Sequence, residues 1–233
     1  MVVRLNVPRY RQGYMECGPI CLKQVMEYFD NVKYEVKSII KETKSKYMNN
    51  DWIFLLAIAA MKRGFKAKVI TLSTEIFDPS WSELDNKKLV KKFKKRLEYL
   101  KSKKNKDYYI RAFNIAPLEK AIEFIEKGGN LVFSPIYEEL IEYFIKNKIP
   151  VIVTVNENIF YGIKRLYNEE YDDIRGNANG HMVVISGFDK KNFIITDPER
   201  LSDRKKGIIK RNKKFMLNCI LTFSPNLLII YKK

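Results

Sequence analysis

The spacing of apolar residues changes along the chain, from helical periodicity in the front half to strand-like runs in the rear half. Helices are predicted over three ranges of the front half: 18–29, 34–47 and 51–63. Pro19 suits the first position of the first helix, Asn50 is suited to cap the third, and Gly64 is the expected end of the third. Residues 65–72, FKAKVITL, alternate between apolar and polar as a strand does.

The rear half consists mainly of short apolar runs between turn-forming residues. Strands are predicted at 130–136, 150–155, 181–188, 192–198, 206–211 and 226–231, and helices at 117–129 and 137–148. The polar stretch 156–180 is predicted to be a loop, with a length and position suited to a lid. The pattern therefore predicts one two-lobed α+β domain over residues 1–233, helical to about residue 130 and mainly antiparallel sheet from about 131.

Residues 82–107 form a basic amphipathic helix in this pattern. The apolar stripe along it consists of Leu84, Leu89, Val90, Phe93, Leu97 and Leu100. Eleven Lys or Arg residues lie between positions 87 and 106. A helix of this kind covers a core with its apolar face and keeps its lysines in water, or it lies on an acidic partner or an anionic membrane surface.

Composition and charge limit the classes of function. The chain has 233 residues and a formal net charge of +17, yet no nucleic-acid-binding motif accompanies the charge, which argues against nucleic acid as a partner. The three cysteines do not pair into a disulfide framework, which favours a reducing, cytoplasmic location. The start of the chain lacks the pattern of a signal peptide, and the most apolar run is too short to span a membrane.

The stretch RQGYMECGPICLKQVMEYF, residues 11–29, places Cys17 at the start of a predicted helix. The unpaired amide N–H groups of a first helical turn favour a thiolate over a thiol. Gly18 is expected to leave room for a substrate backbone beside the sulfur. Gln12 carries an amide that could donate to a developing oxyanion together with the Cys17 N–H.

A cysteine nucleophile needs a base, and the chain offers one histidine, His181, at the start of a predicted strand. Asp197 ends the next predicted strand, sixteen residues later. Antiparallel pairing of the two strands would bring these side chains together, so that the carboxylate fixes the tautomer of the imidazole. Cys21, four residues after Cys17, leaves open a regulatory disulfide or a Cys17/Cys21/His181 metal site, whereas simple packing is the plainer interpretation.

Two segments carry a family resemblance. QGYMECGPICL resembles the nucleophile motif of the bacteriocin-processing, double-glycine leader peptidases, family thirty-nine of the papain-like cysteine peptidases, and GHMVVISGFDKKNFIITDP is similar to the histidine segment of that family. The resemblance implies a papain-like fold without cofactor or metal. It implies Cys17 as nucleophile, His181 as general acid and base, Asp197 as orienting residue and Gln12 as oxyanion donor. No transporter segment or phosphate-binding loop accompanies the motifs, so the resemblance is to a stand-alone peptidase domain.

The expected function is cleavage of a peptide or amide bond in a peptide or protein substrate. Transpeptidase, deamidase or thioesterase chemistry would use the same side chains and stays open as an alternative. A further alternative is a non-catalytic adaptor that binds an acidic partner through the basic helix of residues 82–107. Five acidic residues in the polar stretch could select positively charged peptides or simply be solvated: Glu157, Glu169, Glu170, Asp172 and Asp173.

Overall fold

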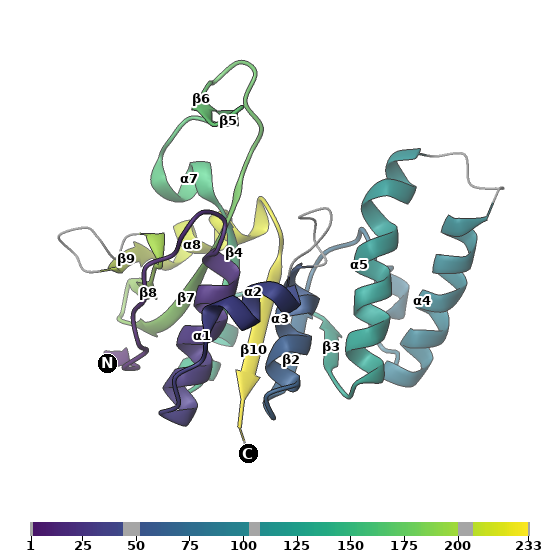
Figure 1. Ribbon diagram of the computed structural model, residues 1–233, viewed down its shortest axis with the longest axis horizontal. Helices are drawn as coiled ribbons and strands as arrows, with labels where there is room; N and C mark the ends of the chain where they lie inside the picture. The colour runs from purple at the N-terminus through teal and green to yellow at the C-terminus, as the bar shows by residue number, and fades with distance from the viewer. Residues whose placement is uncertain (1, 44–51, 103–107, 200–206, 233) are drawn as a thin grey trace.

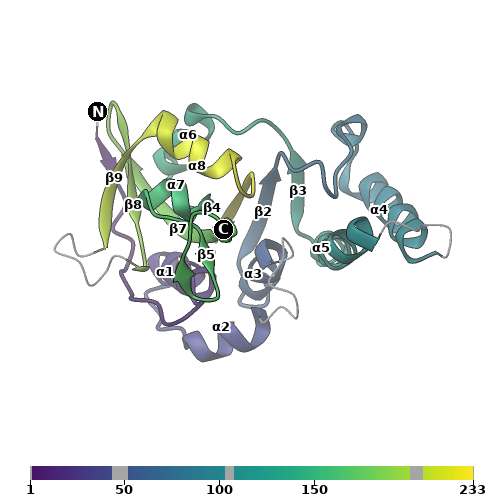
Figure 2. The same ribbon diagram turned by 90° about the horizontal axis from the view of Figure 1, so that it is seen from above.

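The protein folds around one large twisted sheet that is covered by helices on both faces (Figures 1 and 2). The structure, a computed structural model, describes residues 2–43, 52–102, 108–199 and 207–232. The strand order in the main sheet is β3-β2-β10-β4-β7-β8-β9, with β1 paired to β7. All of the strand pairs in this sheet are antiparallel except β2 with β3, which is parallel.

The strands of the main sheet are β1 (Val3–Arg4), β2 (Lys66–Thr71), β3 (Asn130–Phe133), β4 (Val151–Asn156), β7 (Gly180–Phe188), β8 (Asn192–Thr196), β9 (Ile208–Asn212) and β10 (Asn226–Tyr231). A separate small hairpin consists of β5 (Leu166–Tyr167) and β6 (Glu170–Tyr171). The central strands β4, β7 and β10 are rich in Val, Ile and Leu and are buried along nearly their whole length, as strands covered on both faces must be.

The helices are α1 (Cys17–Asp30), α2 (Val36–Thr43), α3 (Trp52–Met61), α4 (Asn86–Lys101), α5 (Tyr108–Glu126), α6 (Glu138–Lys146), α7 (Glu157–Tyr161) and α8 (Lys213–Leu221), with a short 3-10 turn, η1, at Pro79–Trp81. Helices α1, α2 and α3 lie on one face of the sheet, and α6 and α8 lie on the other (Figure 2). Helix α3 carries apolar residues on all sides because it is enclosed between the sheet and other helices.

The α+β class and the mostly antiparallel sheet predicted from the sequence are confirmed. The front half also supplies β1 and β2 to this sheet, so the sheet unites both halves of the chain. Gly64 ends the α3 region with a φ of +82°, in agreement with its expected role. The last four residues of the helix predicted at 34–47, and Asn50, lie outside the described residues.

Three elements differ from the sequence-based expectation. Helix α5 begins at Tyr108 rather than at Pro117, which lies inside it; a proline favours the first turn, and the packing of α5 against α4 overrides that preference here. The stretch 156–180 is not only loop, since it contains α7 and the β5–β6 hairpin. Helix α8 was not predicted, because its apolar residues follow directly on those of strand β9 and precede those of β10 in the sequence.

The basic segment forms helix α4, which packs against α5 at the β3 end of the sheet (Figure 1). The helix starts at Asn86, because Asp85 accepts a hydrogen bond of 2.8 Å from the Lys88 N–H and so caps it. Leu89, Phe93 and Leu100 are buried. The apolar stripe of α4 therefore covers core, and residues 103–107 of the predicted helix lie outside the described residues.

Candidate active site

Cys17 is the first residue of α1, and it packs where α1 meets β7. The chain enters the helix through a tight turn in which Met15 adopts a left-handed conformation with a φ of +56°. The Glu16 carboxylate accepts a 2.8 Å hydrogen bond from the Gly13 N–H and closes this turn. Cys17 keeps 6% of its surface exposed, so only a small opening reaches the residue.

Gly18 has a packing role rather than the expected role in substrate access. A Cβ atom at this position would lie 3.0 Å from the Met182 sulfur and 3.1 Å from a methyl group of Leu56. Both neighbours belong to the core beside the sheet, and real Cβ atoms rarely make such close contacts. The glycine therefore lets α1 approach β7 and α3, which sets the depth at which Cys17 lies.

His181 and Asp197 meet where two neighbouring strands end. Strands β7 and β8 pair antiparallel, as expected from the sequence, and this pairing places the start of β7 near the residue after β8. The distance between His181 Nε2 and Asp197 Oδ1 is 3.0 Å. Both residues are almost fully buried, with 3% and 1% of their surface exposed.

The Cys17 side chain also lies close enough to the imidazole to raise the pKa of His181. Because Nε2 is taken by Asp197, Nδ1 is the ring nitrogen left to face the sulfur. Burial lowers the pKa of His181, but the contacts with Asp197 and Cys17 and the charges of these two groups raise it more, so that the pKa is about 10. The imidazole is therefore protonated at neutral pH, and its positive charge lies between a sulfur and a carboxylate.

Gln12 lies beside the third member of this group. Its backbone N–H donates a 3.3 Å hydrogen bond to the carbonyl of Pro198, the residue that follows Asp197. Its side-chain Oε1 is buried and has no hydrogen-bond partner among the described residues. The structure thus brings the four predicted site residues, Gln12, Cys17, His181 and Asp197, into one region of the molecule from three separate parts of the chain.

The segment that carries Gln12 is held against α1 by a buried carboxylate. The Tyr10 hydroxyl donates to the Glu27 carboxylate, and the Gln24 side chain donates to the Tyr10 carbonyl at 3.3 Å. Burial raises the pKa of Glu27, but hydrogen bonds from Lys23, Tyr10 and the Tyr34 N–H lower it by more. The net shift of the pKa is therefore downward. Glu27 therefore stays ionised and keeps the segment before Cys17 in place.

Sequence reasoning missed one polar neighbour of the site, Tyr161 on α7. Its hydroxyl donates a 2.8 Å hydrogen bond to Oδ2 of Asp197, the carboxylate oxygen opposite the one that contacts His181. The residue was missed because its segment was interpreted as a loop. A signal was available, since Asn156 caps a short helix and Gly162 ends it with a φ of +67°.

Cys21 makes a packing contact instead of joining a metal or disulfide site. Its sulfur donates to the Met182 carbonyl at 3.3 Å, and the residue is fully buried. Burial, followed by the nearby Cys17 and Asp197, raises the pKa of Cys21 well above its usual value, which keeps it a thiol. No cluster of three or more potential metal ligands occurs within the described part of the chain.

Two of the acidic residues of the stretch 156–180 have local partners, whereas Glu169 accepts a 3.3 Å hydrogen bond from the Tyr14 hydroxyl. Asp172 accepts hydrogen bonds from the Ile174 and Arg175 N–H groups and from the Arg175 side chain, and Asp173 pairs with Lys164 at 3.0 Å. Glu157 differs from them because it lies near His181. Burial raises its pKa, the charge of His181 lowers it, and the charges of Glu199 and Asp197 raise it, with a net upward shift.

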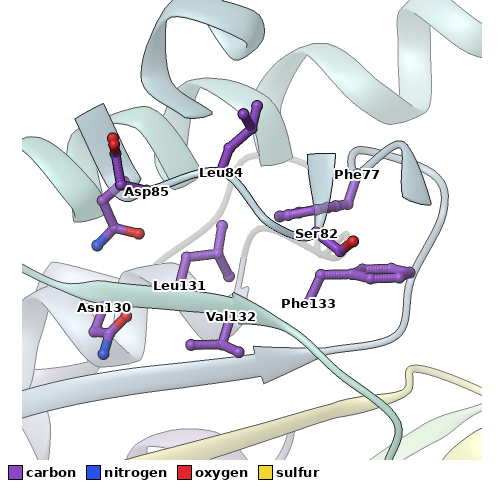
Figure 3. Close-up of a pocket in the computed structure, with 9 residues that line it drawn as sticks. Phe77, Ser82, Leu84, Asp85, Asn130, Leu131, Val132 and Phe133 are labelled. Atoms are coloured by element: carbon purple, nitrogen blue, oxygen red, sulfur yellow. The ribbon is translucent and has the colours of Figure 1, made fainter. Parts of the chain in front are cut away.

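A cavity of about 390 Å³ lies far from Cys17 in the fold, between β3 and the segment that leads into α4 (Figure 3). Phe77, Leu84, Leu131 and Phe133 are among the residues that line it. None of the four predicted site residues lines this cavity. Its position next to α4 makes it a feature of the helical end of the molecule.

The sequence of this chain matches the model of the Peptidase_C39 like family over residues 4–218. The chain belongs to this family. At family level, membership indicates a papain-like cysteine peptidase. Cys17, His181 and their neighbours are the candidate catalytic residues of this chain. No curated protein matches the chain.

Among solved structures, a Bacillus anthracis protein described as a C39-like peptidase resembles this member of the Peptidase_C39 like family over 100% of the present chain and 98% of its own. The two share 15% sequence identity, with a TM-score of 0.47. None of the helices within the described residues is both long and apolar enough to cross a bilayer.

Proposed function

We propose that the protein is a cysteine peptidase that uses Cys17 as nucleophile, His181 as general acid and base, Asp197 as orienting residue and Gln12 as oxyanion donor. The observation that carries the proposal is the buried chain of contacts from the Cys17 sulfur through the imidazole to the Asp197 carboxylate, 3.0 Å from Nε2. Family membership supports peptide bonds as the substrate class.

The first half of the reaction uses the charge already present at the site. The imidazolium of His181 stabilises negative charge on the sulfur, and the Cys17 thiolate attacks the carbonyl carbon of the scissile amide. A tetrahedral oxyanion forms. The imidazolium then gives its proton to the leaving nitrogen as the C–N bond breaks, which releases the amine and leaves a thioester on Cys17.

The second half reverses the role of the imidazole. Neutral His181 takes a proton from water while the water oxygen attacks the thioester carbonyl, and the C–S bond breaks to release the carboxylic acid product and the sulfur. Asp197 holds Nε2 throughout, so that Nδ1 keeps facing the sulfur.

Negative charge on the oxyanion is balanced by two donors. The Cys17 N–H is among the first amides of α1, which have no carbonyl partner within the helix. The Gln12 side chain supplies the second donor, and its backbone contact with Pro198 keeps it next to the imidazole–carboxylate pair.

A thiol-directed probe with a peptidyl reactive group tests the nucleophile and the base together. Wild type should be labelled at Cys17, and His181→Ala should be labelled at least about a hundred-fold more slowly at pH 7, because it lacks the proton partner of the sulfur. Cys219→Ala provides the matched control, since this buried thiol lies on α8 and should not affect labelling. Equal labelling of wild type and His181→Ala would rule the proposal out.

The location in the cell stays a prediction. The three cysteines are free thiols, which is compatible with the reducing cytoplasm expected from their odd number. An acidic partner for the lysines of α4 likewise stays a prediction.

A further inference from the structure

We propose that Tyr161 is a positioning residue of the site, which fixes the Asp197 carboxylate so that one of its oxygens stays directed at His181. The inference deepens the proposed function and rests on it, because it adds a residue that acts through Asp197 and does not touch the substrate. It draws on the juxtaposition of α7 with the residue that follows β8.

The two oxygens of Asp197 have separate partners. Oδ1 lies 3.0 Å from His181 Nε2 and accepts a further bond of 3.0 Å from the Glu199 N–H, whereas Oδ2 accepts the Tyr161 hydroxyl at 2.8 Å. The terminal torsion of an aspartate has no sharp rotamer preference of its own, so hydrogen bonds decide its orientation. Loss of the hydroxyl would leave Oδ2 buried without this donor and allow the carboxylate to turn.

Tyr161 is itself held by a well-anchored element. The neighbouring Phe160 is 1% exposed, and the Arg211 guanidinium lies 5.1 Å from the centre of its ring. The Asn156 side chain caps the helix by accepting from the Ile159 N–H at 3.1 Å. The hydroxyl therefore reaches Asp197 from a short helix that continues directly from strand β4, rather than from a free loop.

The ring of Tyr161 also lies against the imidazole, with 5.7 Å between the ring centres. It therefore covers the Asp197–His181 pair from the side of α7 and helps to keep water from it. The contact of the carboxylate with the imidazole is therefore supported by one side chain from the stretch 156–180, together with the Glu199 N–H.

The electrostatic surroundings of His181 define what a measurement would report. The groups that face the imidazole are Cys17 from α1, Asp197 after β8, and Glu157 and Tyr161 from α7, with Glu199 beyond Asp197. Replacing Cys17 by alanine removes the sulfur from this set and leaves Asp197 as the hydrogen-bonded group that raises the pKa of the imidazole.

The test uses the fact that the chain contains a single histidine. In protein without a histidine tag and with the substitution Cys17→Ala, the NMR signals of the imidazole report its pKa without ambiguity. Adding Tyr161→Phe should lower that pKa by about one unit, a tenfold loss of proton affinity, because the carboxylate is no longer held toward Nε2. Tyr171→Phe, an exposed tyrosine on the β5–β6 hairpin, is the matched control and should leave it unchanged.

Kinetics supply a second readout in protein that retains Cys17. Tyr161→Phe should reduce kcat about tenfold and change KM less than about twofold, since the residue acts through Asp197. Tyr171→Phe should change neither. An unchanged or raised pKa of His181 in the Tyr161→Phe variant overturns the inference, as does an effect confined to KM.

Failure of the two proposals can be told apart. If the probe does not label Cys17 but Tyr161→Phe still lowers the pKa of His181, the positioning of Asp197 by Tyr161 is supported and the peptidase assignment fails. If Cys17 is labelled in a His181-dependent way and the pKa does not fall, the peptidase assignment stands and the role of Tyr161 is wrong.

Discussion

The region around Cys17 and the α4–α5 pair use charged residues in opposite ways. At the site, the imidazole and the Asp197 carboxylate are buried in direct contact with each other. On α4, lysines face water, and two of them pair with acidic residues of α5, Lys94 with Glu126 at 2.7 Å and Lys101 with Glu119 at 2.5 Å. Water screens the charges of the α4 lysines, but it does not screen the buried His181–Asp197 pair. The interaction within the buried pair is therefore strong enough to serve catalysis.

The largest effect is expected in the buried region around Cys17. Cys17→Ala should reduce peptide cleavage at least about a thousand-fold, since no other described thiol contacts the imidazole, and should leave the fold intact. Cleavage of a fluorogenic peptide library, with circular dichroism as the folding control, measures this. Substantial residual turnover in a well-folded variant would mean that another group is the nucleophile.

A substitution on the buried face of α4 should produce the reverse result, a loss of stability without a loss of catalytic activity. Phe93 is fully buried between Phe77 and Trp81, with ring centres 5.9 and 6.0 Å away. Phe93→Ala should lower the free energy of unfolding by about 3–5 kcal/mol, as measured by urea denaturation. Activity per folded molecule at low temperature should be unchanged, and a selective loss of activity would show that the two regions are coupled.

The pH dependence of cleavage sharpens the contrast from the side of the imidazole. The pKa of His181 is raised from 6.5 to about 10, so the imidazolium persists through neutral pH and is lost as the pH rises through about 10. The rate should therefore stay level between pH 7 and 9 and fall about tenfold per unit above 10. Light scattering must accompany the measurement, because the isoelectric point is about 9.6. An alkaline fall centred near pH 7 would contradict the raised pKa.

The smallest effect is expected on the exposed face of α4. Lys91 and Lys95 are exposed, and replacing both with glutamine should change the free energy of unfolding by less than about 0.5 kcal/mol and leave cleavage unchanged. If the predicted acidic partner exists, the same variant should bind it more weakly, and the loss should shrink at high salt. A large change in stability would show that these lysines have a structural role.

The sequence predicted those features that depend on local periodicity and on strand pairing. Gly64 marks the end of its helix, and the runs at 181–188 and 192–198 pair as antiparallel neighbours, which is enough to bring His181 to Asp197. The features that were missed depend on tertiary contacts. Pro117 lies inside α5 because two helices pack along each other, and Gly18 faces Met182 rather than a substrate. Neither contact is visible in a local pattern.

Tyr161 shows the same limit within the site. A five-residue helix is too short to give a periodic signal, and only its cap and its final glycine mark it in the sequence. The Tyr161 hydroxyl reaches Asp197 because α7 follows β4 and Asp197 follows β8. These two strands are separated by β7 in the sheet, so the contact depends on the tertiary structure.

Strand β3 lies at the end of the strand order, next to the helices α4 and α5. An outermost strand offers unpaired amide and carbonyl groups to any other extended chain, including another molecule of the same protein. The segment from Phe77 to Asn86 runs alongside β3, and the Asn86 side chain donates to the Gly129 carbonyl at 3.1 Å (Figure 3). This cover shields the border of the sheet, and the exposed lysines of the adjoining helix α4 add mutual repulsion between molecules, so trimming both away would favour self-association.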